Sequence, residues 1–285
     1  MQATVETFFH KATNSFTYLV WEDASRRAAV IDPVLDYDAA AAASSAASVG
    51  EVGDRIEALD LALDWILETH VHADHLSAAQ SLQARCGGKT AIGASVTAVQ
   101  VTFRELFAAE DLVADGSQWD RLLQPDERLP LGGLEIQVLA TPGHTPACVT
   151  YVIGDAAFVG DTLFMPDFGT ARCDFPGGDA AQLYRSIRAI LALPPETRLF
   201  MCHDYCPGGR DLRWETSVAE QLSENVHLQA CPSAEAFVDF RAKRDSGLSV
   251  PALLLPAVQV NIRAGRLPPA AENGTHYLKI PLNRL

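Results

Sequence analysis

The sequence predicts an α/β fold in which two mixed β-sheets lie between two layers of helices. Short apolar strands recur in both halves of the chain, and most are followed by a segment with helical spacing. No linker, low-complexity tail or strong repeat divides the 285 residues, of which 48% are hydrophobic. A chain of this size can bury a large core. We therefore expect one domain over residues 1–285, with 206–285 as a C-terminal extension packed on it.

Apolar runs bounded by turn residues predict the strands of the first half over 16–21, 28–32 and 65–69. The first two of these form a hairpin. Helical spacing is present over 56–63 and over 76–85, where Gly87 and Gly88 end the second segment. The Ala- and Ser-rich stretch 38–49 is compatible with a helix or with a mobile loop, and the sequence leaves both open.

The second half continues the alternation of strands and helices. Strands are expected over 134–139, 149–153, 156–159 and 198–202. A helix over 179–193 is expected to be capped by Asp179 and ended by the pair Pro194-Pro195. Two further helices are expected over 214–224 and 234–244. The Pro-rich, apolar tail 251–285 is expected to wrap the domain.

Composition excludes several classes of function. The formal net charge of −14 disfavours nucleic acids and anionic membrane surfaces as partners. No run of about eighteen apolar residues predicts a membrane span, and the N-terminal residues lack the basic flank and apolar stretch of a secretory signal. The six cysteines form no Cys-X-X-Cys pair, so a reducing cytoplasm is the expected compartment. The roles of Cys202 and Cys206 stay open.

Three histidines and an aspartate occur within six residues, in the segment His70-Val71-His72-Ala73-Asp74-His75. At the end of a strand, His70 and His72 point to the same side because side chains alternate with period two. Asp74 and His75 enter the following turn, so all four side chains can converge on one point. A polar helix N-terminus capped by Asp74 is the alternative reading. Imidazole and carboxylate groups at this spacing favour a site for zinc, iron or manganese.

Three further polar elements each follow an apolar strand directly. The tight turn Thr141-Pro142-Gly143 presents His144, and Asp161 and His203 follow the strands that end near residues 159 and 202. Taken singly, each of these residues is compatible with an ordinary turn or surface role. Because ligands gather at strand ends in α/β proteins, we expect the three to join the histidine cluster.

The ordered set His70, His72, Asp74, His75, His144, Asp161 and His203 resembles the metallo-β-lactamase superfamily over residues 16–205. The resemblance implies an αββα four-layer sandwich, and it leaves the reaction open because this fold hosts many. In binuclear hydrolases of the superfamily, His70, His72 and His144 would hold one zinc, Asp74, His75 and His203 the other, and Asp161 would bridge them.

A second branch of the superfamily looks closer. The segment Gly169-Thr170-Ala171-Arg172-Cys173-Asp174-Phe175 and the run His203-Asp204-Tyr205 are similar to the persulfide dioxygenases. That resemblance implies one Fe(II) per chain on His70, His144 and Asp161, with His72, Asp74, His75 and His203 orienting these ligands. It also implies that glutathione persulfide and O2 become sulfite and glutathione. No catalytic residue beyond the metal centre is implied.

The same resemblance implies that Arg172 reaches a glutathione carboxylate and that Tyr205 contacts the substrate. An ion pair between Arg172 and Asp174 is the alternative, and Tyr205 is compatible with an ordinary rim position. The segment between Asp161 and Arg172 is two residues longer than in the animal enzymes. The longer C-terminal tail is compatible with shaping the pocket or with a homodimer contact.

The competing prediction is a zinc-dependent thioesterase of the glyoxalase II type. That family usually has His-Glu-Tyr where this chain has His203-Asp204-Tyr205, and it carries a basic helical domain for glutathione. The only nearby basic cluster is Arg241, Lys243 and Arg244, which we interpret as a solvated helix face. A non-catalytic protein that kept the fold is the third alternative, and failure to hold any metal would be its first sign.

Overall fold

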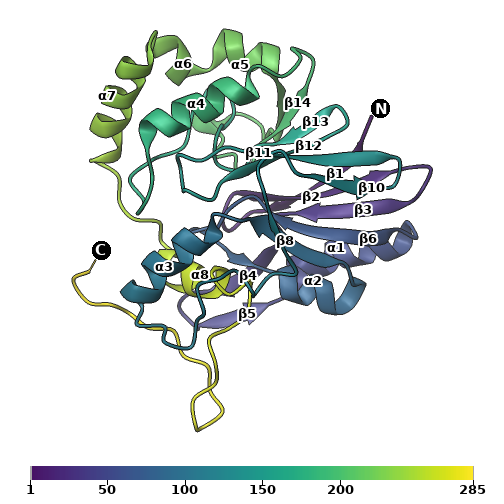
Figure 1. The fold of residues 1–285 in the computed structure, drawn as a ribbon, viewed down its shortest axis with the longest axis vertical. Helices are drawn as coiled ribbons and strands as arrows, with labels where there is room; N and C mark the ends of the chain where they lie inside the picture. The colour runs from purple at the N-terminus through teal and green to yellow at the C-terminus, as the bar shows by residue number, and fades with distance from the viewer. Residues whose placement is uncertain (1, 285) are drawn as a thin grey trace.

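Two six-stranded β-sheets lie face to face at the centre of the computed structural model, which describes residues 2–284 (Figure 1). The first sheet has the order β1 (Thr4–His10), β2 (Ser15–Glu22), β3 (Arg27–Ile31), β6 (Ala62–Glu68), β8 (Lys89–Gly93) and β9 (Arg121–Leu123). The second has the order β10 (Arg128–Leu131), β11 (Leu134–Ala140), β12 (Val149–Ile153), β13 (Ala156–Phe158), β14 (Arg198–Phe200) and β15 (Glu215–Ser217). Each sheet contains both parallel and antiparallel pairs.

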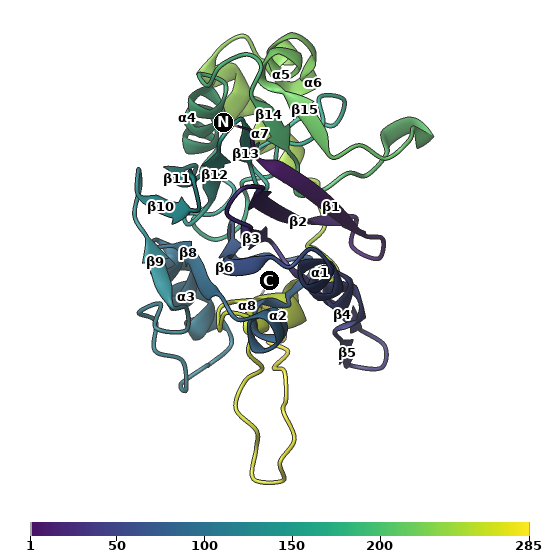
Figure 2. The same cartoon turned by 90° about the vertical axis from the view of Figure 1, so that its right-hand side faces the viewer.

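Helices cover the outer face of each sheet, which completes four layers (Figures 1 and 2). The first sheet is covered by α1 (Ala47–Ala58), α2 (Ala79–Cys86), α3 (Val96–Leu106) and α8 (Leu254–Asn261). The second is covered by α4 (Ala180–Ile190), α5 (Val218–Glu224), α6 (Val226–Ala230) and α7 (Ala234–Asp245). A small third sheet joins β5 (Ala43–Ser45), β4 (Val34–Asp38) and β7 (Leu76–Ser77). The predicted αββα sandwich is confirmed.

Side chains from both sheets fill the space between them. Tyr18 packs against Phe158 and Phe200 with ring centroids 5.2 and 5.3 Å apart, and the last two rings stack at 4.9 Å. Because both faces of each sheet are covered, the central strands are buried almost throughout and read as continuous apolar runs. This core holds the strand ends in place, and the polar motifs begin at those ends.

Most of the predicted elements are present. The predicted hairpin is β2 paired antiparallel with β3, although β1 precedes it and was not predicted. The carboxylate of Asp179 accepts a hydrogen bond from the backbone N–H of Gln182, as expected of an N-cap. Helix α4 ends at Ile190, before the Pro194-Pro195 pair. Among the described residues, no helix is long and apolar enough to span a bilayer.

Four expectations were wrong in part. Over 38–49 the chain forms neither one helix nor a loop, because Asp38 Oδ1 accepts N–H groups of Ala40 and Ala41 and turns the chain into strand β5. The predicted helical segment 56–63 stops at residue 58, where a left-handed Asp60 ends α1 before β6 begins.

The last two differences lie in the C-terminal part. Residues 215–217 form strand β15, and the helix predicted over 214–224 begins only after Ser217, which caps it. The apolar tail contains a further helix, α8, which the proline content concealed. Its Pro256 lies in the first turn, where a missing N–H costs no hydrogen bond.

Candidate metal centre

The predicted motifs meet at one edge of the sandwich, where strands of both sheets end. β6 leads into the segment 70–75, and β11, β13 and β14 of the other sheet lead to His144, Asp161 and His203. The two sheets therefore each contribute part of one cluster. All five of these histidines and Asp161 are at most 9% exposed.

Two imidazoles and one carboxylate form the first group. The ligand atoms of His70, His144 and Asp161 all lie within 4.8 Å of one another. Asp161 Oδ2 is 3.9 Å from His70 Nε2 and 3.6 Å from His144 Nε2. Two histidines and one carboxylate leave several positions open on an octahedral ion, which is the donor set of non-haem Fe(II) oxygenases.

The other four predicted residues continue the cluster. His203 Nε2 lies 3.3 Å from both Asp74 Oδ2 and Asp161 Oδ1. The His72 ring lies between those of His70 and His75, with centroid distances of 4.0 and 4.1 Å. The structure therefore brings all seven residues of the motif set together.

Each imidazole of the cluster uses one ring nitrogen as a donor to a fixed oxygen. Nδ1 of His144 donates to the carbonyl of Arg172 over 2.8 Å, and Nδ1 of His70 faces Thr69 Oγ1 at 3.0 Å. His72 is reversed, with Nε2 facing Asp32 Oδ1 at 3.0 Å. Such bonds set the tautomer and the ring orientation of metal-binding histidines.

The opposite atoms of these side chains lack hydrogen bonds, although His203 Nε2 lies within ion-pair distance of Asp74 and Asp161. Nine buried side-chain atoms have no hydrogen bond within the described residues, and six of them belong to the cluster: His70 Nε2, His72 Nδ1, His75 Nε2, His203 Nε2, Asp74 Oδ2 and Asp161 Oδ1. Buried polar atoms without hydrogen bonds are costly, and six of these nine belong to the residues of one small cluster. The donor set therefore fits a metal ion.

Burial keeps part of the cluster in the neutral form that a ligand needs. It lowers the pKa of His75 to about 3, and the charge on His72 acts in the same direction. Burial also lowers the pKa of His70 well below its usual value. Burial raises the pKa of Asp161, but the facing His203, His70 and His144 outweigh it and hold that pKa well below its usual value. The neutral imidazoles of His70 and His75, close to the ionised Asp161, are ready to bind a cation.

Sequence reasoning missed the residues beneath the cluster. Asp32 follows β3 and accepts from the backbone N–H of Thr69 over 2.7 Å, from its hydroxyl over 2.8 Å and from His72. Glu68 Oε2 lies 3.4 Å from His72 Nε2. In the sequence, a single aspartate after an apolar strand does not indicate a role in a metal site. Only the packing of β3 beside β6 places Asp32 beneath the cluster.

The C-terminal extension also supports the centre. Asn261 at the end of α8 donates from Nδ2 to the carbonyls of His72 and His75, both over 2.8 Å. Its Oδ1 accepts from the backbone N–H of Ser77. One side chain thus clamps the loop 70–77 over a sequence separation of more than 180 residues. The tail therefore also holds the loop that carries the histidine cluster, in addition to covering the domain.

A cavity of about 420 Å³ opens onto the cluster. His144, Asp161 and Asp74 line the part that faces the cluster, and Phe164, Phe168, Phe175 and Tyr205 line the walls. Its remaining lining includes three arginines, Arg172, Arg241 and Arg244, and apolar residues of the extension, Leu248 and Pro251–Leu253. The cavity has the size of a small-molecule site, and its arginines contrast with the acidic charge of the whole chain.

Both predicted substrate residues line this cavity. Arg172 forms a two-point ion pair with Asp174, each bond 2.6 Å long, and donates to the carbonyl of Ser249. The alternative ion pair considered for Arg172 is therefore present. Tyr205 is 42% exposed and stacks on His203 with ring centroids 5.8 Å apart. Partial removal from water raises the pKa of Tyr205 to about 12, and its hydroxyl is protonated near neutral pH with or without this shift.

The interpretation of Arg241, Lys243 and Arg244 as a solvated helix face was wrong for Arg241. That side chain is 2% exposed, pairs with Asp245 and donates to the carbonyl of Thr170. Helix α7 packs against α4, which turns this side of the helix inward. Arg244 is exposed but lines the cavity, and no ion pair is found for it within residues 2–284.

The chain is similar to curated proteins with different names. It is 54% identical to a probable metallo-hydrolase of Burkholderia pseudomallei, covering 99% of this chain and 100% of that protein. It is 44% identical to glyoxylase B2 of Dictyostelium discoideum, covering 100% and 98%. Identity to the human mitochondrial persulfide dioxygenase ETHE1 is 30%, covering 92% and 89%. The chain spans 65% of the length of other relatives that it matches.

Among solved structures, ETHE1 from Myxococcus xanthus is similar, with a TM-score of 0.74 and 31% identity. That match covers 92% of this chain and 100% of the other. A family model described as the metallo-β-lactamase superfamily matches residues 10–203, which include all seven residues of the cluster. This chain belongs to the metallo-β-lactamase superfamily.

Proposed function

We propose that this protein is a persulfide dioxygenase that converts glutathione persulfide, O2 and water into glutathione and sulfite. The observation that carries the proposal is the group His70, His144 and Asp161, two members of which face the cavity. One Fe(II) bound there would supply the electrons that start O2 activation. Similarity to persulfide dioxygenases supports the same reaction.

The chain's own residues orient and shield this centre. The carbonyl of Arg172 fixes the His144 ring, and Thr69 fixes the His70 ring through its own bond to Asp32. We propose that His72, Asp74, His75 and His203 hold water and these ligands in place, as positioning residues. The aromatic walls exclude bulk water from the open side of the centre.

The substrate in this proposal is an anion, and the cavity offers cations to hold it. We propose that Arg172 and Tyr205 contact the glutathione moiety. Arg172 uses three of its five N–H groups on Asp174 and Ser249, which leaves two for a carboxylate. The phenol of Tyr205 lines the same cavity and stays a hydrogen-bond donor near neutral pH.

A metal analysis combined with an oxygen electrode tests this proposal. We expect about one iron per chain, oxygen uptake with glutathione persulfide, and sulfite as product. Asp161→Ala should abolish iron binding because it removes the only carboxylate of the group. No oxygen uptake by the iron-loaded protein would overturn the proposal.

A binuclear thioesterase is the second candidate. The atoms without partners on His72, His75, His203 and Asp74 favour it, because one iron leaves them without a metal. The similarity to a protein named glyoxylase B2 points the same way. Two zinc ions per chain together with hydrolysis of a glutathione thioester would select this candidate instead.

A further inference from the structure

Cys202 lies at the floor of the metal cluster, and neither candidate function uses it. Its side chain is 2% exposed, and its Sγ has one long contact, 3.8 Å to Asp32 Oδ2. The backbone is fixed on both sides, since the carbonyl of Cys202 accepts from Phe16 N and Met201 N donates to the carbonyl of Trp214. The backbone that carries the thiol is therefore held on both sides.

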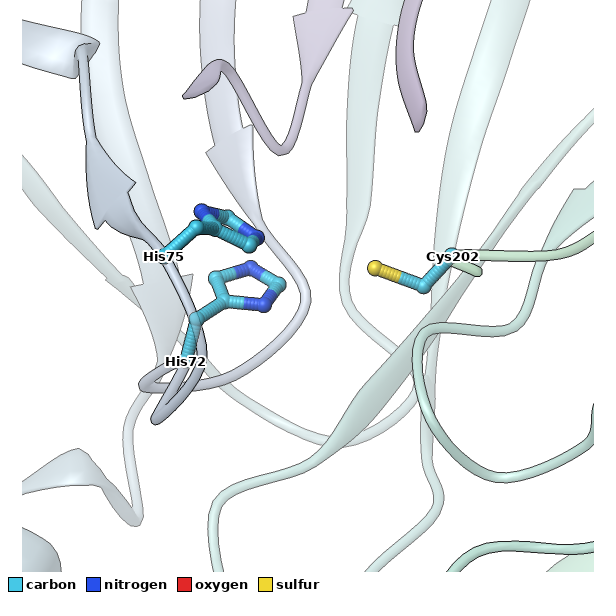
Figure 3. A group of neighbouring side chains, drawn as sticks. All are labelled: His72, His75 and Cys202. Atoms are coloured by element: carbon cyan, nitrogen blue, oxygen red, sulfur yellow. The ribbon is translucent and has the colours of Figure 1, made fainter. Parts of the chain in front are cut away.

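The Sγ atom of Cys202 lies close to four residues of the cluster. It lies within 4.8 Å of ring nitrogens of His72 and His75, and within the same distance of His203 and Asp161 on the other side. Figure 3 shows the thiol pointing toward the rings of His72 and His75. His75 Nε2 and His72 Nδ1 are buried and have no partner among residues 2–284. Each of these two imidazoles thus has one ring nitrogen without a hydrogen bond close to the thiol.

We propose that Cys202 is a thiolate ligand of a second metal position, shared with His72 and His75. Thiolate and imidazole donors favour a soft or borderline ion such as Zn²⁺, whereas the carboxylate-containing group with His70 and His144 suits Fe(II). Binding transfers the thiol proton to solvent. The cluster would then hold two positions of different metal preference. The inference does not depend on which reaction the protein catalyses.

Cobalt supplies an optical test that needs no catalytic assay. The full chain is stripped of metal with a chelator and titrated with Co²⁺, a spectroscopic substitute for Zn²⁺. We expect thiolate-to-cobalt charge-transfer absorption in the near ultraviolet within two equivalents. Cys202→Ser should lose this absorption and still bind Co²⁺ at the other position.

Cys148→Ser is the matched control. Cys148 is also buried, but its Sγ contacts Thr145 Oγ1 at 3.1 Å and belongs to none of the candidate metal groups. This variant should keep the absorption in full. The same absorption in Cys202→Ser, or none in the wild-type protein at two equivalents, would overturn the proposal.

X-ray absorption of the zinc-loaded wild-type protein tests the site without any variant. We expect a sulfur neighbour at about 2.3 Å beside nitrogen neighbours. A shell of nitrogen and oxygen alone would refute the thiolate ligand, even if the Cys202 variant fails to fold. Because neither readout measures oxygen uptake, failure of the dioxygenase proposal would leave these results unaffected.

Discussion

The buried ion pair between Arg241 and Asp245 offers a direct test of the tertiary structure. The side chains of Arg241 and Asp245 are 2% and 6% exposed, and Asp245 Oδ2 also accepts from the backbone N–H of Cys173. Arg241→Met would leave Asp245 as a buried charge without its partner and the carbonyl of Thr170 without a donor. Breaking such a pair costs about 3–5 kcal/mol.

For a chain of 285 residues, with an unfolding entropy of about 2.1 cal/mol/K per residue, that loss corresponds to a fall in Tm of roughly 5–8 °C. Urea denaturation of the metal-free protein measures the free energy of unfolding directly. Arg128→Met is the control, because Arg128 and Glu135 form an exposed pair, with side chains 58% and 61% exposed. An exposed pair contributes about 0–1 kcal/mol.

A double variant distinguishes the energetic cost of the unpaired buried charge from the cost of lost packing. Arg241→Met combined with Asp245→Leu removes both charges, so we expect it to recover at least half of the loss. If Arg241→Met costs no more than Arg128→Met, the buried position of Arg241 is wrong. The helix face would then be solvated, as the sequence pattern alone suggested.

Two further predictions concern the cavity and its support. Arg172→Ala should raise KM for the persulfide by roughly 10- to 150-fold. This corresponds to the loss of about 1.5–3 kcal/mol from a hydrogen bond to a charged group. Steady-state kinetics measure the change, and an unchanged KM would show that Arg172 does not contact the substrate. Burial, with the charges of Arg241 and Arg244, lowers the pKa of His227 to about 4. Between about pH 4 and 6.5 the unfolded protein therefore binds more protons at His227 than the folded protein does. The free energy of unfolding decreases as the pH is lowered through this window, by about 2 kcal/mol from pH 7.5 to pH 5. His227→Gln keeps an acceptor for Thr170 N and should lack this part of the pH dependence in urea denaturation, whereas an unchanged slope would contradict the assignment.

Local sequence patterns determined much of the fold and of the candidate site. The spacing in the segment 70–75 implied converging side chains by strand geometry alone. Asp179 was identifiable as a cap, because an N-cap bond spans only three residues. The order of the strand-end motifs along the chain resembles that of the superfamily. These features depend on neighbours in the chain, and so the sequence contains them directly.

Tertiary packing decided the rest. Asp32, Cys202 and Asn261 show no local motif, yet β3, β14 and α8 bring them to the floor and side of the cluster. Arg241 is buried because α7 lies against α4. The mixture of polar and apolar residues along α7 does not indicate which side of the helix is buried. In each case the environment of a side chain is set by elements distant in sequence. A pattern of neighbouring residues cannot encode those partners.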